Sequence, residues 1–134
     1  FLAAMRRILA DFGAEVRSEL GRAKPDTRAE AVIKACFAPS CFTPQTISAW
    51  MTFYVMAQTN AQALRLWQIY QGRMRSNLTH ALRPLTKTPK RAANTLTALI
   101  DGLYIRAALH DPDTPEMATA HALAVLDLLR EPRQ

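Results

Sequence analysis

The sequence predicts an all-α fold, and three observations favour it. No stretch alternates apolar and polar residues with the period of two that a half-buried strand shows. Thr-Pro occurs three times, in the pattern that is typical of a helix start. Between these points apolar residues recur at spacings of three and four, which is the repeat of one helix face. The chain has 134 residues, 49% hydrophobic and 21% charged, which suits one globular domain.

Six helices with short connections are expected. The residues that favour helix starts are Thr43, Thr88 and Thr114, each followed by proline, together with Asp26 and Asn60. At such positions a side-chain oxygen accepts a hydrogen bond from a free backbone N–H group of the first turn. The expected helices cover residues 1–22, 26–38, 44–59, 61–83, 89–110 and 115–131.

The first expected helix is amphipathic from its first residue. Its apolar stripe consists of Leu2, Met5, Leu9, Phe12, Val16 and Leu20. No capping residue precedes this stripe, although a helix usually begins with one. We therefore expect the chain to be part of a longer protein.

The expected helix over residues 44–59 is apolar on nearly all sides, so we predict that it lies at the centre of the fold. Its longest nearly apolar run, 49–57, is interrupted by Thr52 and is well short of the roughly 20 residues that a membrane span needs. The sequence also lacks the pattern of a signal peptide. We expect a cytoplasmic domain with no membrane partner.

Two cysteines, Cys36 and Cys41, are too few for a disulfide framework. A zinc site would need further ligands, and His80, His110 and His121 have no regular ligand spacing. We expect neither a metal nor a cofactor, and we interpret the cysteines as small apolar residues near a helix end. A redox switch stays open for the case that both are exposed.

The net charge of +6 is unevenly distributed, since residues 31–100 contain no Asp or Glu. The basic residues in that stretch are Lys34, Arg65, Arg73, Arg75, Arg83, Lys87, Lys90 and Arg91. Direct binding of nucleic acid would favour aromatic residues among the basic ones. Here the aromatic residues lie in apolar runs. We interpret the basic residues as a solvated face that could assist long-range attraction to DNA.

The last two expected helices have apolar faces that are too broad for burial on one side. This breadth predicts a partner, most simply a second copy in a four-helix interface. Gly102 would allow the helices to approach closely, and coverage within one copy is the alternative. The expected interface residues are Leu99, Gly102, Leu103, Arg106, Ala122, Val125, Leu126 and Leu129.

Several segments together resemble one known family. They are the run 98–109, which contains Ile-Asp-Gly at 100–102, the run 48–54, and the Ser-Asn-Leu segment 76–78 that follows Tyr70. In order and spacing they resemble the regulatory domain of TetR-family transcriptional repressors, most closely the betaine/choline-responsive type. The resemblance covers about residues 1–130.

This resemblance implies a six-helix regulatory domain in which the last two helices form a dimeric four-helix bundle. Residues 1–134 would be the ligand-sensing and dimerisation domain of a homodimer. The N-terminal helix-turn-helix domain that contacts DNA in the family is absent from this chain, and the first helix would be the connector to it. A small molecule would bind among the earlier helices and change the spacing of the recognition helices. Such a protein is not an enzyme.

The resemblance also places six aromatic residues around a ligand pocket. Aromatic rings attract a quaternary ammonium through their quadrupoles, so choline, betaine aldehyde or another small organic ligand is the expected effector. Ordinary core packing is the alternative for each ring. The expected ligand-binding residues are Trp50, Phe53, Tyr54, Trp67, Tyr70 and Tyr104.

A cationic ligand also needs a carboxylate, and the middle of the chain has none. The nearest candidates are Asp11, Glu15 and Asp101. We expect Asp101 to have a structural role, as a cap or in an ion pair with Arg106 across the dimer, with ligand contact as the alternative. An inward-facing basic residue such as Arg73 would instead suit an anionic effector, so an anionic or apolar effector stays open.

A second function is compatible with the same helices, namely a purely structural dimerisation module without a ligand pocket. The two functions differ in packing, because a sensor needs a ligand-sized cavity and a module has a close-packed core. A cavity lined by Trp50, Trp67 and Tyr70 would favour the sensor.

Overall fold

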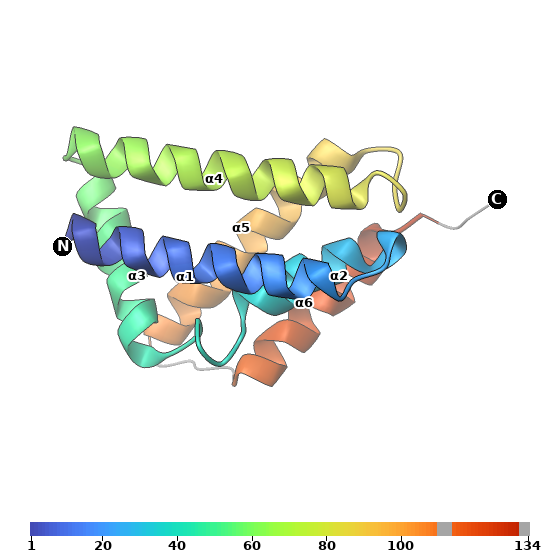
Figure 1. Cartoon of the computed structure of the whole chain (residues 1–134), viewed down its shortest axis with the longest axis horizontal. Coiled ribbons are helices and arrows are strands. Elements are labelled where there is room, and N and C mark those ends of the chain that lie inside the picture. Colours follow the sequence, from blue (N-terminus) through green and yellow to red (C-terminus); the bar gives the residue numbers. More distant parts are fainter. Residues whose placement is uncertain (110–113, 132–134) are drawn as a thin grey trace.

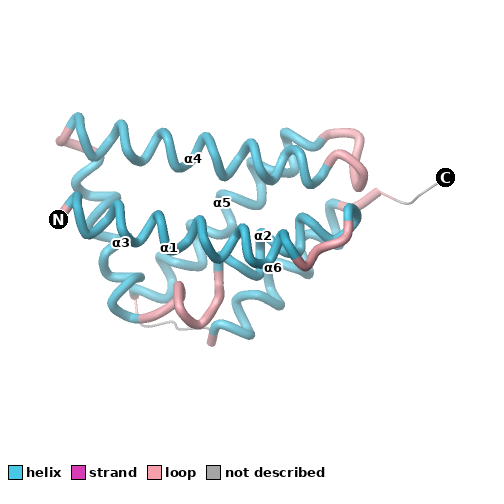
Figure 2. The backbone as a smooth tube through the Cα atoms, viewed as in Figure 1, coloured by secondary structure: helices cyan, strands magenta, loops and turns pink. Residues whose placement is uncertain are grey.

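The computed structural model describes residues 1–109 and 114–131. Within these ranges it contains six α-helices, one short 3₁₀ helix and no strand, which confirms the all-α fold (Figure 2). The elements are α1 (Leu2–Gly21), η1 (Pro25–Thr27), α2 (Arg28–Cys36), α3 (Pro44–Ala57), α4 (Ala61–Leu82), α5 (Pro89–Ala108) and α6 (Pro115–Leu129).

Three of the predicted helix caps form the expected hydrogen bonds. The Thr43 hydroxyl accepts from the Thr46 N–H at 3.2 Å, and the Asn60 side chain accepts from the Ala63 N–H at 3.0 Å. Thr114 caps α6 in the same way, at 3.1 Å from the Met117 nitrogen. Each bond satisfies a backbone donor that would otherwise have no partner inside its helix.

The other two predicted caps behave differently. Thr88 occupies the cap position of α5, but its hydroxyl lies 3.4 Å from the hydroxyl of Thr86 and makes no cap bond. The prediction for Asp26 was wrong, because this residue lies inside η1 and α2 begins after Thr27. Proline at position 25 begins a 3₁₀ turn that displaces the start of α2. The predicted end of the fifth helix, at residue 110, lies outside the described residues.

The helix at the centre of the fold is α2, and not the helix over 44–59 that the sequence predicted. Six of the nine residues of α2 are buried, and the helix packs against α1, α4 and α6. In α3 only Ile47, Trp50 and Phe53 are buried, and Val55 is 64% exposed. Alanines on α2 let α1, α4 and α6 approach closely, whereas α3, which packs against α1, α4 and α5, leaves more of its residues exposed to solvent.

Helices α1 and α4 run in the same direction along the front of the molecule (Figure 1). Helix α1 packs against α2 and α3, while α4 packs against α2, α3 and α5. A groove of about 550 Å³ lies between α1 and α4, with Leu9, Val16 and Met74 among its apolar lining residues. Arg6, Arg17 and Arg73 are the charged residues of this α1–α4 groove.

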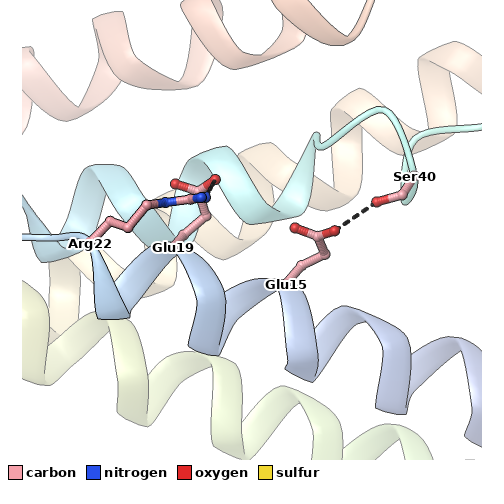
Figure 3. A network of polar contacts seen from close by, with 4 residues as sticks. All are labelled: Glu15, Glu19, Arg22 and Ser40. Atoms are coloured by element: carbon pink, nitrogen blue, oxygen red, sulfur yellow. Dashed lines mark hydrogen bonds and ion pairs between the residues drawn. The ribbon is translucent and has the colours of Figure 1, made fainter.

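Polar contacts fix the C-terminal half of α1. The Ser40 hydroxyl, in the loop after α2, donates to Glu15 Oε1 at 3.0 Å, and Arg22 pairs with Glu19 at 2.9 Å (Figure 3). Glu15 therefore contacts the loop, and it lines neither the α1–α4 groove nor the small cavity beside Asp101. Among the described helices, none is long and apolar enough to cross a membrane.

The end of α6 is joined to the turn between α4 and α5. The Glu131 N–H donates to the Leu85 carbonyl at 2.9 Å, and the Thr86 hydroxyl donates to Glu131 Oε1 at 3.3 Å. Arg130 also lies 3.5 Å from Glu30 of α2. These contacts hold the ends of α2, α4 and α6 together.

Candidate functional site

Trp50 of α3 is the centre of an aromatic cluster. Its ring centroid lies 4.9 Å from that of Tyr70 and 6.2 Å from that of Tyr104. The rings of Phe53 and Tyr54, one helical turn away, lie at 5.8 and 5.9 Å. Three helices, α3, α4 and α5, thus bring together five of the six predicted ligand-binding residues. We call Trp50, Tyr54, Tyr70, Tyr104 and Asp101, which line one small cavity, the aromatic cage.

The carboxylate of the aromatic cage comes from Asp101 of α5. Tyr54 donates its hydroxyl hydrogen to Asp101 Oδ1 at 3.0 Å, across 47 residues of sequence. Burial raises the pKa of Asp101, while hydrogen bonding by Tyr54 and Gln71 acts in the opposite direction. Burial and the neighbouring Asp101 also raise the pKa of the Tyr54 phenol. Among the described residues Asp101 forms no ion pair, and it lines the cavity together with the rings; its expected pair with Arg106 of a second copy stays a prediction.

The cage is closed in this structure. The cavity that its members line, together with Phe12, Cys36 and Ile100, has a volume of about 10 Å³. That is near the lower limit for a single water molecule. A second cavity of about 40 Å³, lined by Asp11 among others, lies on another side of Trp50 and Tyr104. Neither cavity holds an organic ligand without movement of side chains.

Phe12 and Tyr70 separate the closed cavity from the α1–α4 groove. Both residues line the cavity and the groove, and their rings meet edge to face with centroids 5.8 Å apart. Phe12 belongs to α1 and Tyr70 to α4, so their ring contact connects these two helices. Displacement of either ring would join the closed cavity to the open groove.

Two predicted ligand-binding residues do not line the cavity. Phe53 is completely buried and packs behind Trp50 as a core residue. Trp67 is half-buried on α4, outside the cluster, and its buried Nε1 has no hydrogen-bond partner among the described residues. A helical spacing of three or four places residues on one face, but it does not determine which part of that face reaches the cavity.

The sequence argument missed three phenylalanines that support the cage. Phe37 and Phe42 pack on Tyr104, with ring centroids 5.8 and 5.1 Å away, and Phe12 packs on Tyr70. Phe12 could have been found from the apolar stripe of the first helix. Phe37 and Phe42 flank a proline-containing loop, and no periodic pattern marks such positions.

The two cysteines are free and buried. Cys36 ends α2, and its carbonyl accepts a hydrogen bond from the Tyr104 hydroxyl. Burial raises the pKa of the Cys36 thiol, so the reactive thiolate is disfavoured. Burial likewise raises the pKa of Cys41. Within the described ranges, no group of three His, Cys, Asp or Glu side chains is arranged to hold a metal ion.

The predicted dimer-interface residues fall into two sets. Leu103, Ala122 and Leu126 are buried inside a single copy, so a second copy cannot contact them without opening the core. The remaining five are accessible at least in part, and they are Leu99, Gly102, Arg106, Val125 and Leu129. A Cβ atom added at Gly102 would meet no atom within 4 Å in one copy.

Residues 25–131 match the family described as BetI-type transcriptional repressor, C-terminal. The HTH-type transcriptional regulator BetI of Brucella anthropi is 44% identical over 125 residues, which cover 91% of this chain and 64% of that protein. BetI of Agrobacterium fabrum is 40% identical over 111 residues, covering 81% of this chain and 54% of its own length. The chain thus spans less than two thirds of the curated relatives that it matches.

Two solved structures have the same fold. A transcriptional regulator from Rhodococcus sp. Rha1 superposes with a TM-score of 0.81 at 17% identity, over 94% of this chain and 68% of that one. A transcriptional regulator from Pseudomonas aeruginosa PAO1 gives 0.77 at 25% identity, over 91% and 65%. The relatives are transcriptional regulators and not enzymes. The chain therefore belongs to the family of BetI-type transcriptional repressors and matches their C-terminal regulatory domain over residues 25–131.

Proposed function

We propose that this chain is the effector-sensing and dimerisation domain of a transcriptional repressor, and that its effector is a small quaternary ammonium compound such as choline or betaine aldehyde. The observation that carries this proposal is the position of Asp101 in the wall of the aromatic cage. Aromatic faces attract a cation that has no N–H group to donate, and a carboxylate in a poorly solvated site adds countercharge.

The effector would enter from the α1–α4 groove by separating Phe12 from Tyr70. The groove is open, whereas the cage holds about 10 Å³ of free space, so binding requires these rings to move. Because Phe12 belongs to α1, the same movement would shift the helix that connects to the DNA-binding domain in this family. Ligand binding would thereby favour one of two positions of α1.

A structural dimerisation module is the competing function, and the closed state of the cage favours it. Such a module would keep Trp50 and its neighbours as a permanently packed core. The two functions differ in their response to a ligand, since only a sensor is stabilised by one.

The test is calorimetric titration of the chain with choline and with its uncharged isostere, 3,3-dimethylbutan-1-ol. We expect saturable binding of choline, and at least about tenfold weaker binding to the Asp101→Asn variant, because one ion contact is removed while the shape and the acceptor for Tyr54 are kept. The isostere should not discriminate between the two proteins.

The matched control is Asp127→Asn, which removes an exposed carboxylate on α6. This variant should bind choline as the unmodified chain does. Equal weakening by both variants would show a general charge effect. Absence of saturable binding of choline, betaine aldehyde and glycine betaine would leave the structural module as the function.

We also propose that two copies associate through the outer faces of α5 and α6. Several large apolar side chains are exposed there, namely Ile105 at 42%, Leu109 at 72%, Met117 at 57% and Leu128 at 84%. Exposed apolar residues on neighbouring helices mark an interaction surface, and Gly102 leaves room for close approach. The half-buried Leu99, Val125 and Leu129 would border this surface.

Sedimentation of the Leu128→Glu variant tests this interface. Because Leu128 makes little contact within one copy, the variant should fold normally and sediment as a monomer. Val55→Glu is the matched control, since Val55 is also exposed and apolar but lies on α3. An unchanged mass for Leu128→Glu, or an equal change for both variants, would place the interface elsewhere.

In the full-length protein, we propose that this dimer sets the spacing of two helix-turn-helix domains on an operator, in the cytoplasm, and that the effector releases the operator. A twofold protein matches half-sites of fixed separation, so a shift of α1 would weaken binding. Operator affinity of the full-length repressor, measured with and without choline, tests this coupling. Unchanged affinity at saturating choline would contradict it.

A further inference from the structure

A second, larger depression lies at the end of the molecule opposite to the N-terminus (Figure 1). It has a volume of about 650 Å³ and lies where α1 ends, α2 and α5 begin and α4 ends. Ligand sites in proteins usually have volumes of a few hundred to about a thousand cubic ångströms. We call it the basic groove, after Arg28, Arg75, Arg83 and Lys90, which line it together with His80 and Asn94.

The charge of the basic groove is not balanced by its own lining. No Asp or Glu lies among its lining residues. None of its four Arg and Lys side chains takes part in an ion pair within the described parts of the chain. Glu30, close to Arg28 in sequence, pairs instead with Arg130. Four cations that converge without a carboxylate repel one another, and an anion in the groove would relieve this repulsion.

One donor of the groove also lacks an acceptor. The Nε atom of Arg28 is buried from solvent and has no hydrogen-bond partner among the described residues. A buried donor without an acceptor is unfavourable, so a change of the Arg28 rotamer that brings this N–H group to an oxyanion in the groove would be favoured. Helix α5 begins beside the groove, and its cap residue Thr88 leaves the first-turn N–H groups without a side-chain acceptor. The positive ends of α2 and α5 attract an anion, and the four lining cations outweigh the negative ends of α1 and α4, which also lie at the groove.

We propose that the basic groove binds a phosphate-bearing small molecule, at a site separate from the aromatic cage. The planar forks of Arg28, Arg75 and Arg83 suit the paired oxygens of phosphate, and Lys90 adds a further positive charge. The two sites have opposite electrostatic character, because the cage contains a carboxylate and the groove contains only cations. A ligand with charge of a single sign therefore cannot suit both sites.

The probe is inorganic pyrophosphate, titrated into the chain by calorimetry at constant ionic strength. The groove variant is Arg83→Gln/Lys90→Gln, since both residues are exposed and their replacement leaves the core intact. The matched control is Lys87→Gln/Arg91→Gln, which removes the same charge from exposed neighbours that do not line the groove. We expect the groove variant to bind pyrophosphate at least about tenfold more weakly and the control less than about twofold.

Three results would overturn the proposal. Equal weakening by the two double variants would show general attraction of anions to a basic surface. Absence of saturable pyrophosphate binding would show that the groove is no phosphate site. Binding of a DNA duplex without binding of pyrophosphate would assign the surface to nucleic acid. The Asp101→Asn variant should retain pyrophosphate binding, which separates this test from that of the effector site.

Discussion

Helices α4 and α5 contribute residues to both the aromatic cage and the basic groove, yet the two sites differ in burial and charge. The cage is closed, and its one ionisable acid, Asp101, is held by a tyrosine hydroxyl. The groove is open, and three of its four cations, Arg75, Arg83 and Lys90, are exposed to solvent. The comparison shows that burial separates the two signs of charge: a carboxylate is kept inside only where hydrogen bonds support it, while the excess of arginine and lysine remains at the surface.

The largest expected effect comes from opening the cage at its centre. Trp50→Ala should lower the free energy of unfolding by about 3–5 kcal/mol, because it removes a buried ring that packs against four others. Urea unfolding measures this loss. Val55→Ala, on the exposed side of the same helix, should change stability by less than about 0.5 kcal/mol. Similar losses for both variants would mean that the cage is not part of the core.

An intermediate effect is expected from the acid of the cage, and it depends on pH. Burial raises the pKa of Asp101, so the unfolded chain ionises this residue at a lower pH than the folded chain does. The stability contributed by the neutral carboxyl is complete below the ordinary pKa of about 4 and is lost as the pH rises through the raised value. Relative to Asp101→Asn, the unmodified chain should therefore lose stability across this window.

Urea unfolding of the two proteins from about pH 3 to about pH 8 measures that difference. The Tyr54→Phe variant provides a control, because it removes a hydrogen bond that favours the ionised carboxylate and should extend the window to higher pH. A difference between the unmodified chain and Asp101→Asn that stays constant with pH would contradict burial of the carboxyl group.

The smallest expected effect belongs to the groove. Arg83→Gln/Lys90→Gln should change the free energy of unfolding by less than about 0.5 kcal/mol, since both side chains are exposed and unpaired within the described chain. Any change at low salt should be stabilising, because like charges are removed, and it should vanish at higher ionic strength. Marked destabilisation would show instead that these side chains support the fold.

Much of the fold could be predicted from the sequence because helix signals are local. Thr43, Asn60 and Thr114 cap helices as predicted, since a cap depends on residues three positions apart. The position of each helix in the fold is not a local property, so the sequence pattern of one helix does not predict it. Helix α2 is central and α3 is peripheral, although α3 is the more apolar, because burial depends on which neighbours a helix meets.

The sequence could predict which kinds of residue form the candidate site, but it could not predict which of these residues contact one another. The sequence marked the aromatic residues of α3, α4 and α5 and named Asp101 among three candidate acids. The bond from Tyr54 to Asp101 joins residues 47 positions apart, so only the packed helices reveal it. Phe53 and Trp67 lie on suitable helices but outside the cavity. The basic groove could not be predicted either, since Arg28 and Lys90 are far apart in sequence and line one groove only in the folded chain.

The contact between Phe12 and Tyr70 also has a mechanical consequence. Glu15, in the C-terminal half of helix α1, contacts the loop after α2 (Figure 3). Phe12 lies near the midpoint of the same helix. If α1 moved as a stiff rod about Gly21, Leu2 would move about twice as far as Phe12, since the two lever arms span about 14 and about 29 Å. The completely buried Met5 would shift with it. A displacement of one ring width inside the domain would therefore reach the far end of α1 amplified.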